Sequence, residues 1–282
     1  MSLNDSLCNL TNNAAHINPQ LTSSIDGRLL KAVQIRGDFP TSLNLLNKIE
    51  SALESEDASV DAIARMICVD HILALRVISI SNYEYYRGEN AVGSVADALR
   101  HLGLAKVEGI ISHLAQAKNF NAIYLGRAVS LTMMQQAIIA SVISKQLVKM
   151  LAPEGELEEK AYVTSVLTNI GPLLLAFYKP NIYSGLCLDC MDDRLLFEEI
   201  FKKVMSRSIG KFAGEVVRTL SLPEEYSELA ALADTPPWKH KLSTKGAKTD
   251  KLKIASAVYM ANLLAHEICY FTGIQGIQGL LR

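Results

Sequence analysis

The histidines and cysteines are the side chains in this sequence that could bind a metal or act as nucleophiles. Cys187 and Cys190 have the spacing of half a zinc site or of a redox pair, but no second pair accompanies them. His266 is followed by Glu267 without the second histidine that a zinc-protease helix requires. None of the histidines has a recognisable ligand spacing, so structural or surface roles are expected for all six: His16, His71, His101, His113, His240 and His266.

A lysine-rich segment near the C-terminus is a second candidate for binding. Residues 238–253 contain six lysines, and Trp238 is the only tryptophan of the chain. Trp238, Lys239, His240 and Lys241 could therefore contact a phosphate-bearing ligand or a partner protein. A solvated loop is the simpler interpretation of such a charge run. Nucleic-acid binding through this segment is not expected, and it would show steeply salt-dependent affinity.

A tetrad with two polar side chains interrupts the most apolar stretch of the sequence. Residues 161–179 have the composition of a buried helix, and Thr168-Asn169-Ile170-Gly171 lies within it. A hydroxyl and a neutral amide are poor metal ligands compared with an imidazole and a carboxylate. Pro172 follows directly, so we expect the helix either to kink there or to restart with proline in its first turn.

The overall composition is that of a globular protein with a sizeable core. Hydrophobic residues make up 49% of the 282 positions. Lys plus Arg number 28 and Asp plus Glu number 29, so no global charge attracts nucleic acid or an acidic membrane. Apolar runs are shorter than the roughly 20 residues that cross a bilayer. With no basic leader ahead of an apolar run, a cytoplasmic location without membrane contact is expected.

Apolar periodicity and capping residues predict helices along the whole chain. Ser59, Asp70 and Ser94 are positioned to cap three helices, and Gly103 directly follows the third. No early stretch alternates with period two for long enough to form a strand. The predicted fold class is an all-α multi-helix bundle. Later helices are expected over residues 104–120, 130–151, 161–179, 208–226 and about 250–271.

Several of these features occur together in the order found in one family. Phe39-Pro40, Asn82 with Tyr86 and Gly88 after it, and the run from Val92 to Leu104 form the strongest part of the pattern. Gly214 and Leu222-Pro223-Glu224 extend it. The sequence thus resembles the HDOD family, the HD-related output domain of bacterial signalling proteins. The resemblance covers roughly residues 30–235 and implies the same all-α, HD-domain-like fold.

The resemblance also implies where an HD-type hydrolase would hold its metal. Gln135 takes the place of the first histidine, Thr168 and Asn169 that of the His-Asp pair, and Gly210 that of a later histidine. Each replacement is neutral, so neither a bound metal nor another cofactor is expected. Gln135, Thr168 and Asn169 are expected to form a buried polar patch, hydrogen-bonded to one another or to water.

The expected organisation is an N-terminal arm over residues 1–24 and a helical domain over residues 25–235. That domain divides into two sub-bundles, about 25–125 and 126–235. Residues 236–282 are expected to supply the lysine-rich loop and a C-terminal helix packed on the second sub-bundle.

The expected function is a non-catalytic signalling or scaffold module that binds a protein partner or a small ligand. A metal-dependent phosphohydrolase with a non-standard site is the alternative, and bound metal after purification would reveal it.

Overall fold

The computed structural model describes residues 28–30, 43–83, 91–116, 127–153, 157–189, 194–239 and 247–270. Within these ranges every regular element is a helix and no strand occurs, which confirms the predicted all-α class. The first group of helices comprises α3 (Leu43–Leu53), α4 (Val60–Ile67), α5 (His71–Ser81), α6 (Val95–Leu102) and α7 (Leu104–Gln116). The second comprises α8 (Arg127–Leu151), α9 (Glu158–Tyr178), α10 (Pro180–Asp189), α11 (Arg194–Met205), α12 (Ile209–Thr219), α13 (Glu225–Ala233), the 3₁₀ turn η3 (Pro237–Lys239) and α14 (Ala247–Tyr270).

Side-chain caps fix the starts of three helices in the first group. The hydroxyl of Ser59 accepts a hydrogen bond at the start of α4, and that of Ser94 does so at the start of α6. One carboxylate oxygen of Asp70 accepts from two successive backbone N–H groups of α5, each at 3.0 Å. All three caps satisfy amides that have no partner inside their own helix. The capping predictions are therefore confirmed.

Gly103 joins α6 to α7 with a backbone that other residues rarely adopt. Its φ is +79°, and its N–H donates to the carbonyl oxygen of Leu99 at 2.9 Å. α7 begins at the next residue. Only glycine reaches this conformation without strain, because it has no Cβ. The prediction that Gly103 ends the helix is confirmed.

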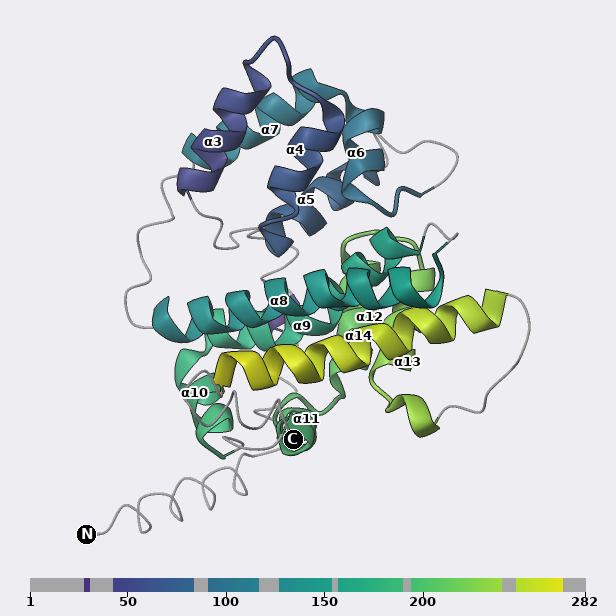
Figure 1. Ribbon diagram of the computed structural model, residues 1–282. Coiled ribbons are helices and arrows are strands. Elements are labelled where there is room, and N and C mark those ends of the chain that lie inside the picture. The colour runs from purple at the N-terminus through teal and green to yellow at the C-terminus, as the bar shows by residue number, and fades with distance from the viewer. Residues whose placement is uncertain are drawn as a thin grey trace.

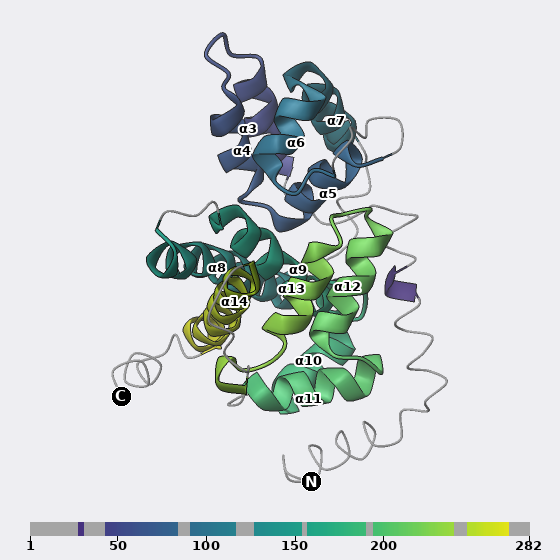
Figure 2. The same ribbon diagram turned by 90° about the vertical axis from the view of Figure 1, so that its right-hand side faces the viewer.

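The second group is built around α9. Sixteen successive residues of this helix, Ala161–Ala176, are buried. Figures 1 and 2 show α8 and α14 side by side along α9, with α12 and α13 also against it. Surrounded on all sides, α9 has to be apolar around its whole circumference. It is long and apolar enough to cross a membrane, but 89% of its most apolar stretch is buried in the protein, as in a core helix.

Pro172 lies inside α9, which continues unbroken from Glu158 to Tyr178. The alternative in which the helix restarts at Pro172 is therefore wrong. Proline has no N–H, so the carbonyl of Thr168, four residues earlier, loses its usual helical donor. Packing on several sides supports the helix across this position.

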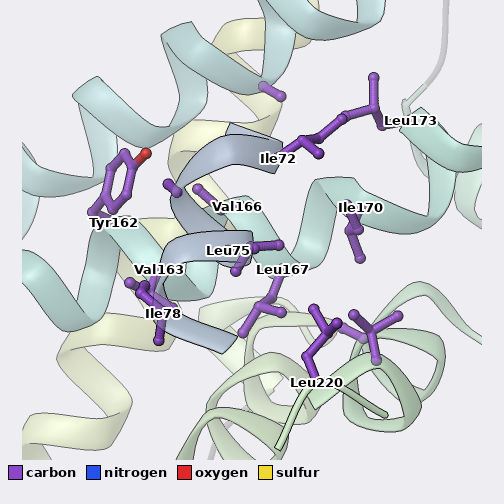
Figure 3. Packing of buried hydrophobic residues seen from close by; sticks show 14 of the residues in the cluster. Ile72, Leu75, Ile78, Tyr162, Val163, Val166, Leu167, Ile170, Leu173 and Leu220 are labelled. Atoms are coloured by element: carbon purple, nitrogen blue, oxygen red, sulfur yellow. The ribbon is translucent and has the colours of Figure 1, made fainter. Parts of the chain in front are cut away.

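The two groups meet through a shared apolar core. Ile72, Leu75 and Ile78 of α5 lie against α9, whose side chains include Val166 and Leu167 (Figure 3). All five side chains are at most 3% exposed. Buried apolar area of this kind is the main stabilising contribution in a folded domain.

Long-range hydrogen bonds between described residues supplement this core. Each joins a residue of the first group to one of the second, and at least one side chain takes part in every case. The pairs are His71 Nε2 with Ser141 Oγ (3.0 Å), Ser79 Oγ with the Leu220 carbonyl (2.9 Å), Tyr162 hydroxyl with the Cys68 carbonyl (3.0 Å) and Tyr226 hydroxyl with the Gly93 carbonyl (2.5 Å).

Candidate functional site

The Thr168-Asn169 pair lies in the middle of α9 and faces α14. Both side chains are buried, with 2% and 1% exposure. The Asn169 side-chain amide donates to Asn262 Oδ1 of α14 at 2.7 Å, and the Asn262 amide donates to Thr168 Oγ1 at 3.1 Å. One residue of α14 thus engages both members of the pair. We call Thr168, Asn169 and Asn262 the polar contact.

The pair also bonds back to its own helix. Thr168 Oγ1 and Asn169 Nδ2 both donate to the carbonyl oxygen of Ser165, at 2.9 and 2.8 Å. That carbonyl is four residues before Asn169, so the side chains stay close to the helix surface. The Thr168 hydroxyl consequently donates its proton to the Ser165 carbonyl and accepts from the Asn262 amide with one of its lone pairs.

Further buried polar groups lie on the helices that surround the polar contact. The side chains of Gln136 in α8 and His266 in α14 are 1% and 4% exposed. Gln136 Nε2, Ser165 Oγ and Asn169 Oδ1 have no hydrogen-bond partner among the described residues. An orphaned buried polar atom costs free energy, so its retention in an apolar core calls for an explanation.

The expected patch of Gln135, Thr168 and Asn169 is wrong in one member. Gln135 is exposed, whereas the next residue, Gln136, is buried. Successive residues of a helix point about 100° apart, so only one of two neighbours can face the core. The third member of the patch is Asn262, which the sequence analysis did not identify. The sequence feature that could have pointed to it is a single amide side chain on the apolar face of its helix, between Val258 and Ala265.

Gly210 has a packing role in α12. A Cβ at this position would lie 2.5 Å from the carbonyl oxygen of Ala230 and 2.9 Å from Asp234 Cβ in the α13 region. Such contacts are far shorter than van der Waals separation, so only glycine permits this approach of α13. A histidine would not fit here. The described residues therefore place no imidazole at any of the four positions implied by the family resemblance.

The C-terminal candidate residues are divided between described and undescribed parts of the chain. Trp238 is 69% exposed and packs edge-on against Tyr259 of α14, with ring centroids 5.9 Å apart. Lys239 is exposed. His240 and Lys241 lie outside the described residues. α14 starts at Ala247, somewhat before the predicted residue 250, so part of the lysine-rich segment is helical.

Two of those lysines are already paired on α14. Lys251 Nζ lies 2.5 Å from Glu228 Oε2 of α13, and Lys253 Nζ lies 3.4 Å from Asp250 Oδ1. These ion pairs reduce the positive charge that this part of the segment presents to a polyanion.

The remaining candidate ligands are scattered. His71 is buried, and desolvation lowers its pKa to about 3, so its ring is neutral near pH 7. His101 and His113 are exposed, whereas His16 and Cys190 lie outside the described residues. Burial also raises the pKa of the Cys68 thiol to about 11, which keeps it protonated. Among the described residues, no group of three or more His, Cys, Asp or Glu side chains could hold a metal ion.

Comparison with known proteins supports the family seen in the sequence. A model of the HDOD domain matches residues 39–236. The chain belongs to the HDOD domain family. The matched region includes α9 and the pair at Thr168 and Asn169, but α14 and Asn262 lie beyond it. No curated protein matches the chain significantly.

Two solved structures of one protein share the fold at low sequence identity. The MmoQ response regulator from Methylococcus capsulatus strain Bath is 19% identical, with a TM-score of 0.63 over 81% of this chain and 86% of that chain. A second MmoQ structure is 16% identical, with a TM-score of 0.58 over 86% and 90%. An HDOD domain protein of unknown function from Geobacter sulfurreducens is 18% identical, covering 88% and 80%, with a TM-score of 0.37.

Proposed function

We propose that this chain is a non-catalytic, cytoplasmic signalling or scaffold module of a bacterium that binds a protein partner or a small ligand. The observation that carries the proposal is the engagement of both Thr168 and Asn169 by Asn262. At the positions where the family resemblance implies a metal-binding pair, this chain has two neutral side chains bonded to a third.

The chemistry of these side chains opposes metal-dependent hydrolysis at this place. A catalytic metal needs imidazole or carboxylate ligands and an open coordination position for water. Thr168 and Asn169 offer neither ligand type, and each is nearly inaccessible to solvent. From α14, Asn262 accepts from the Asn169 amide with its Oδ1 and donates to the Thr168 hydroxyl with its Nδ2. These hydrogen bonds join α9 to α14 and engage the hydroxyl oxygen that Thr168 could otherwise offer to a metal ion.

The similarity of the fold to a response regulator supports the signalling part of the proposal. MmoQ, which shares the fold, is described as a response regulator. A signalling module needs a bound state that alters its contacts with a partner, and it needs no chemistry. The partner is expected to be another protein of the same pathway.

Metal analysis combined with a hydrolysis assay tests the proposal. The wild-type protein, purified without chelators, is analysed for manganese, iron and zinc and assayed with p-nitrophenyl phosphate. We expect far less than one equivalent of metal and no hydrolysis that a chelator abolishes. Asn169→Ala serves as the matched variant and should behave like the wild type in both measurements.

One outcome would replace the proposal with the phosphohydrolase alternative. It is stoichiometric metal in the wild type together with chelator-sensitive turnover. If Asn169→Ala removed that turnover, the polar contact itself would be the active site; if not, a non-standard site elsewhere in the chain would be responsible.

A further inference from the structure

A groove between α12 and α13 carries a cluster of positively charged side chains. It has a volume of about 410 Å³ and runs from the end of α11 along α12 to α13. These three helices lie together in Figure 2. The polar residues that line it are Ser206, Arg207, Lys211, Glu215, Arg218 and Ser227.

The groove lining has three positive charges and one negative charge. Glu215 Oε1 lies 3.0 Å from Arg207 Nη1 and 4.0 Å from Arg218 Nη1, so one carboxylate orients both guanidinium groups. Lys211 is exposed and has no ion pair within the described part of the chain. This single carboxylate leaves the lining net positive. A second acidic residue, Glu224, reaches Arg218 from outside the lining at 3.5 Å.

The helix arrangement brings these groups to one place. Lys211, Glu215 and Arg218 share one face of α12 because they are spaced by four and three residues. On the neighbouring face, Gly214 has no Cβ, and one built there would lie 2.7 Å from Ser227 Oγ. The Ser227 hydroxyl of α13 therefore approaches the α12 backbone closely.

The entry to α12 adds two further features. Ser206 has a φ of +54°, in the left-handed region that serine seldom occupies. This turn places Arg207 at the mouth of the groove, directly before the capping residue Ser208. The N-terminus of α12 contributes the positive end of its helix dipole at the same point.

We propose that this groove binds a small phosphate-bearing molecule. Guanidinium groups, an ammonium and hydroxyls are the side chains that proteins use to hold phosphate oxygens. None of the described residues that line the groove is aromatic, so nothing in it would stack on a nucleobase. The ligand class is accordingly a pyrophosphate or a sugar phosphate. This inference does not rest on the proposed signalling role, since the groove is separate from the polar contact.

Isothermal titration calorimetry with inorganic pyrophosphate tests the proposal on the full-length protein. We expect saturable binding at one site, with a Kd below about 1 mM. Replacing Lys211 by glutamine removes a charge-assisted contact and should weaken binding roughly tenfold. Lys48→Gln is the matched control, because it removes the same charge from an exposed position on α3 and should leave the Kd within about twofold.

Three results would overturn the inference. Equal weakening by Lys211→Gln and Lys48→Gln would show a general charge effect, and the absence of saturable binding would show no site at all. An oligoglutamate peptide is titrated in parallel. If it bound more tightly than pyrophosphate and lost affinity in Lys211→Gln, the groove would be a docking surface for an acidic protein segment. None of these results depends on the metal and hydrolysis assays.

Discussion

The hydroxyl of Tyr162 in α9 donates a hydrogen bond to the carbonyl oxygen of Cys68, the C-cap residue that follows α4, at 3.0 Å. The same ring packs edge-on against His71, with centroids 5.7 Å apart. Tyr162 therefore ties the central helix of the second group to two consecutive helices of the first. Both contacts lie where the two groups of helices meet.

Tyr162→Phe should lower the free energy of unfolding by about 1 kcal/mol, because the Cys68 carbonyl loses its donor while the ring remains. Urea denaturation measures this difference. Tyr83→Phe is the control, since Tyr83 is 50% exposed and its change should stay below about 0.5 kcal/mol. Equal effects of the two substitutions would contradict a specific role for the hydrogen bond.

The buried His71 should make the protein sensitive to acid. Its pKa is lowered to about 3 by burial, so between this value and the ordinary value of 6.5 the unfolded chain binds a proton that the folded chain does not. The contribution is fully present above pH 6.5 and is lost as the pH falls toward 3. The loss is about 1.4 kcal/mol per pH unit inside that window.

The variant His71→Asn isolates this contribution from the carboxylates that titrate in the same range. Unfolding free energies of both proteins are measured at several pH values from 7 to 4. The advantage of the wild type over the variant should shrink as the pH falls. A constant difference would mean that burial does not lower the pKa of His71 in the folded protein.

Gly103 and Gly109 should respond to alanine with opposite signs. At both positions a Cβ would meet nothing within 4 Å, so neither substitution creates a clash. Gly103 has φ +79°, and alanine there should cost about 1–3 kcal/mol in backbone strain. Gly109 is inside α7, where alanine should stabilise by about 1 kcal/mol. Thermal melting of the two variants gives the comparison.

Gly103→Val should cost more than Gly103→Ala. At a positive φ, a β-branched side chain is strained against its own backbone whatever the surrounding space. The melting temperatures of both variants and the parent measure this, and a valine variant that melts with the parent would contradict the need for glycine at this position.

Asn262→Ala should destabilise the protein by about 1–3 kcal/mol, because it leaves the buried Asn169 amide and Thr168 hydroxyl each short of one partner. Asn47→Ala, at an exposed position on α3, is the control. The double variant Asn169→Ala with Asn262→Ala should lose less than the sum of the single variants, as expected for residues in direct contact. Additive losses would show that the two amides act independently.

Restoring the implied pair by Thr168→His with Asn169→Asp should yield neither stoichiometric metal nor phosphoester hydrolysis. The new carboxylate would face Asn262 Oδ1, which now accepts from the Asn169 amide, so an attraction becomes a repulsion. A buried carboxylate without a partner is also strongly disfavoured. We expect a lower melting temperature in addition to inactivity. Chelator-sensitive activity in this variant would contradict the expectation.

Local sequence patterns predicted the helices and their caps well, because a cap depends on residues three or four positions apart. Ser59, Asp70 and Ser94 each act on their own helix. The limits assigned to the arm and the two sub-bundles, and the correspondence of four residues to a metal site, remain predictions.

The partner of the Thr168-Asn169 pair could not be derived in this way. Asn262 is far away in the sequence and reaches the pair only because α14 docks on α8 and α9. Periodicity gives the buried face of α14 but not the helix that this face contacts. The family resemblance points to Gln135, and the apolar pattern of α8 could not show that its neighbour Gln136 is the buried one. α8 packs on both α9 and α14, so its buried surface is broad and its apolar pattern does not separate neighbouring positions.

The long sequence separation between α8 and α14 has a consequence for how the protein is made. α8 emerges from the ribosome well before α14, yet the two helices pack extensively on each other. During synthesis, the surface of α8 and α9 that receives α14 stays open until about residue 270 has left the exit tunnel. The second core therefore cannot close while α14 is still being made, and until then the nascent chain exposes surface that chaperones recognise.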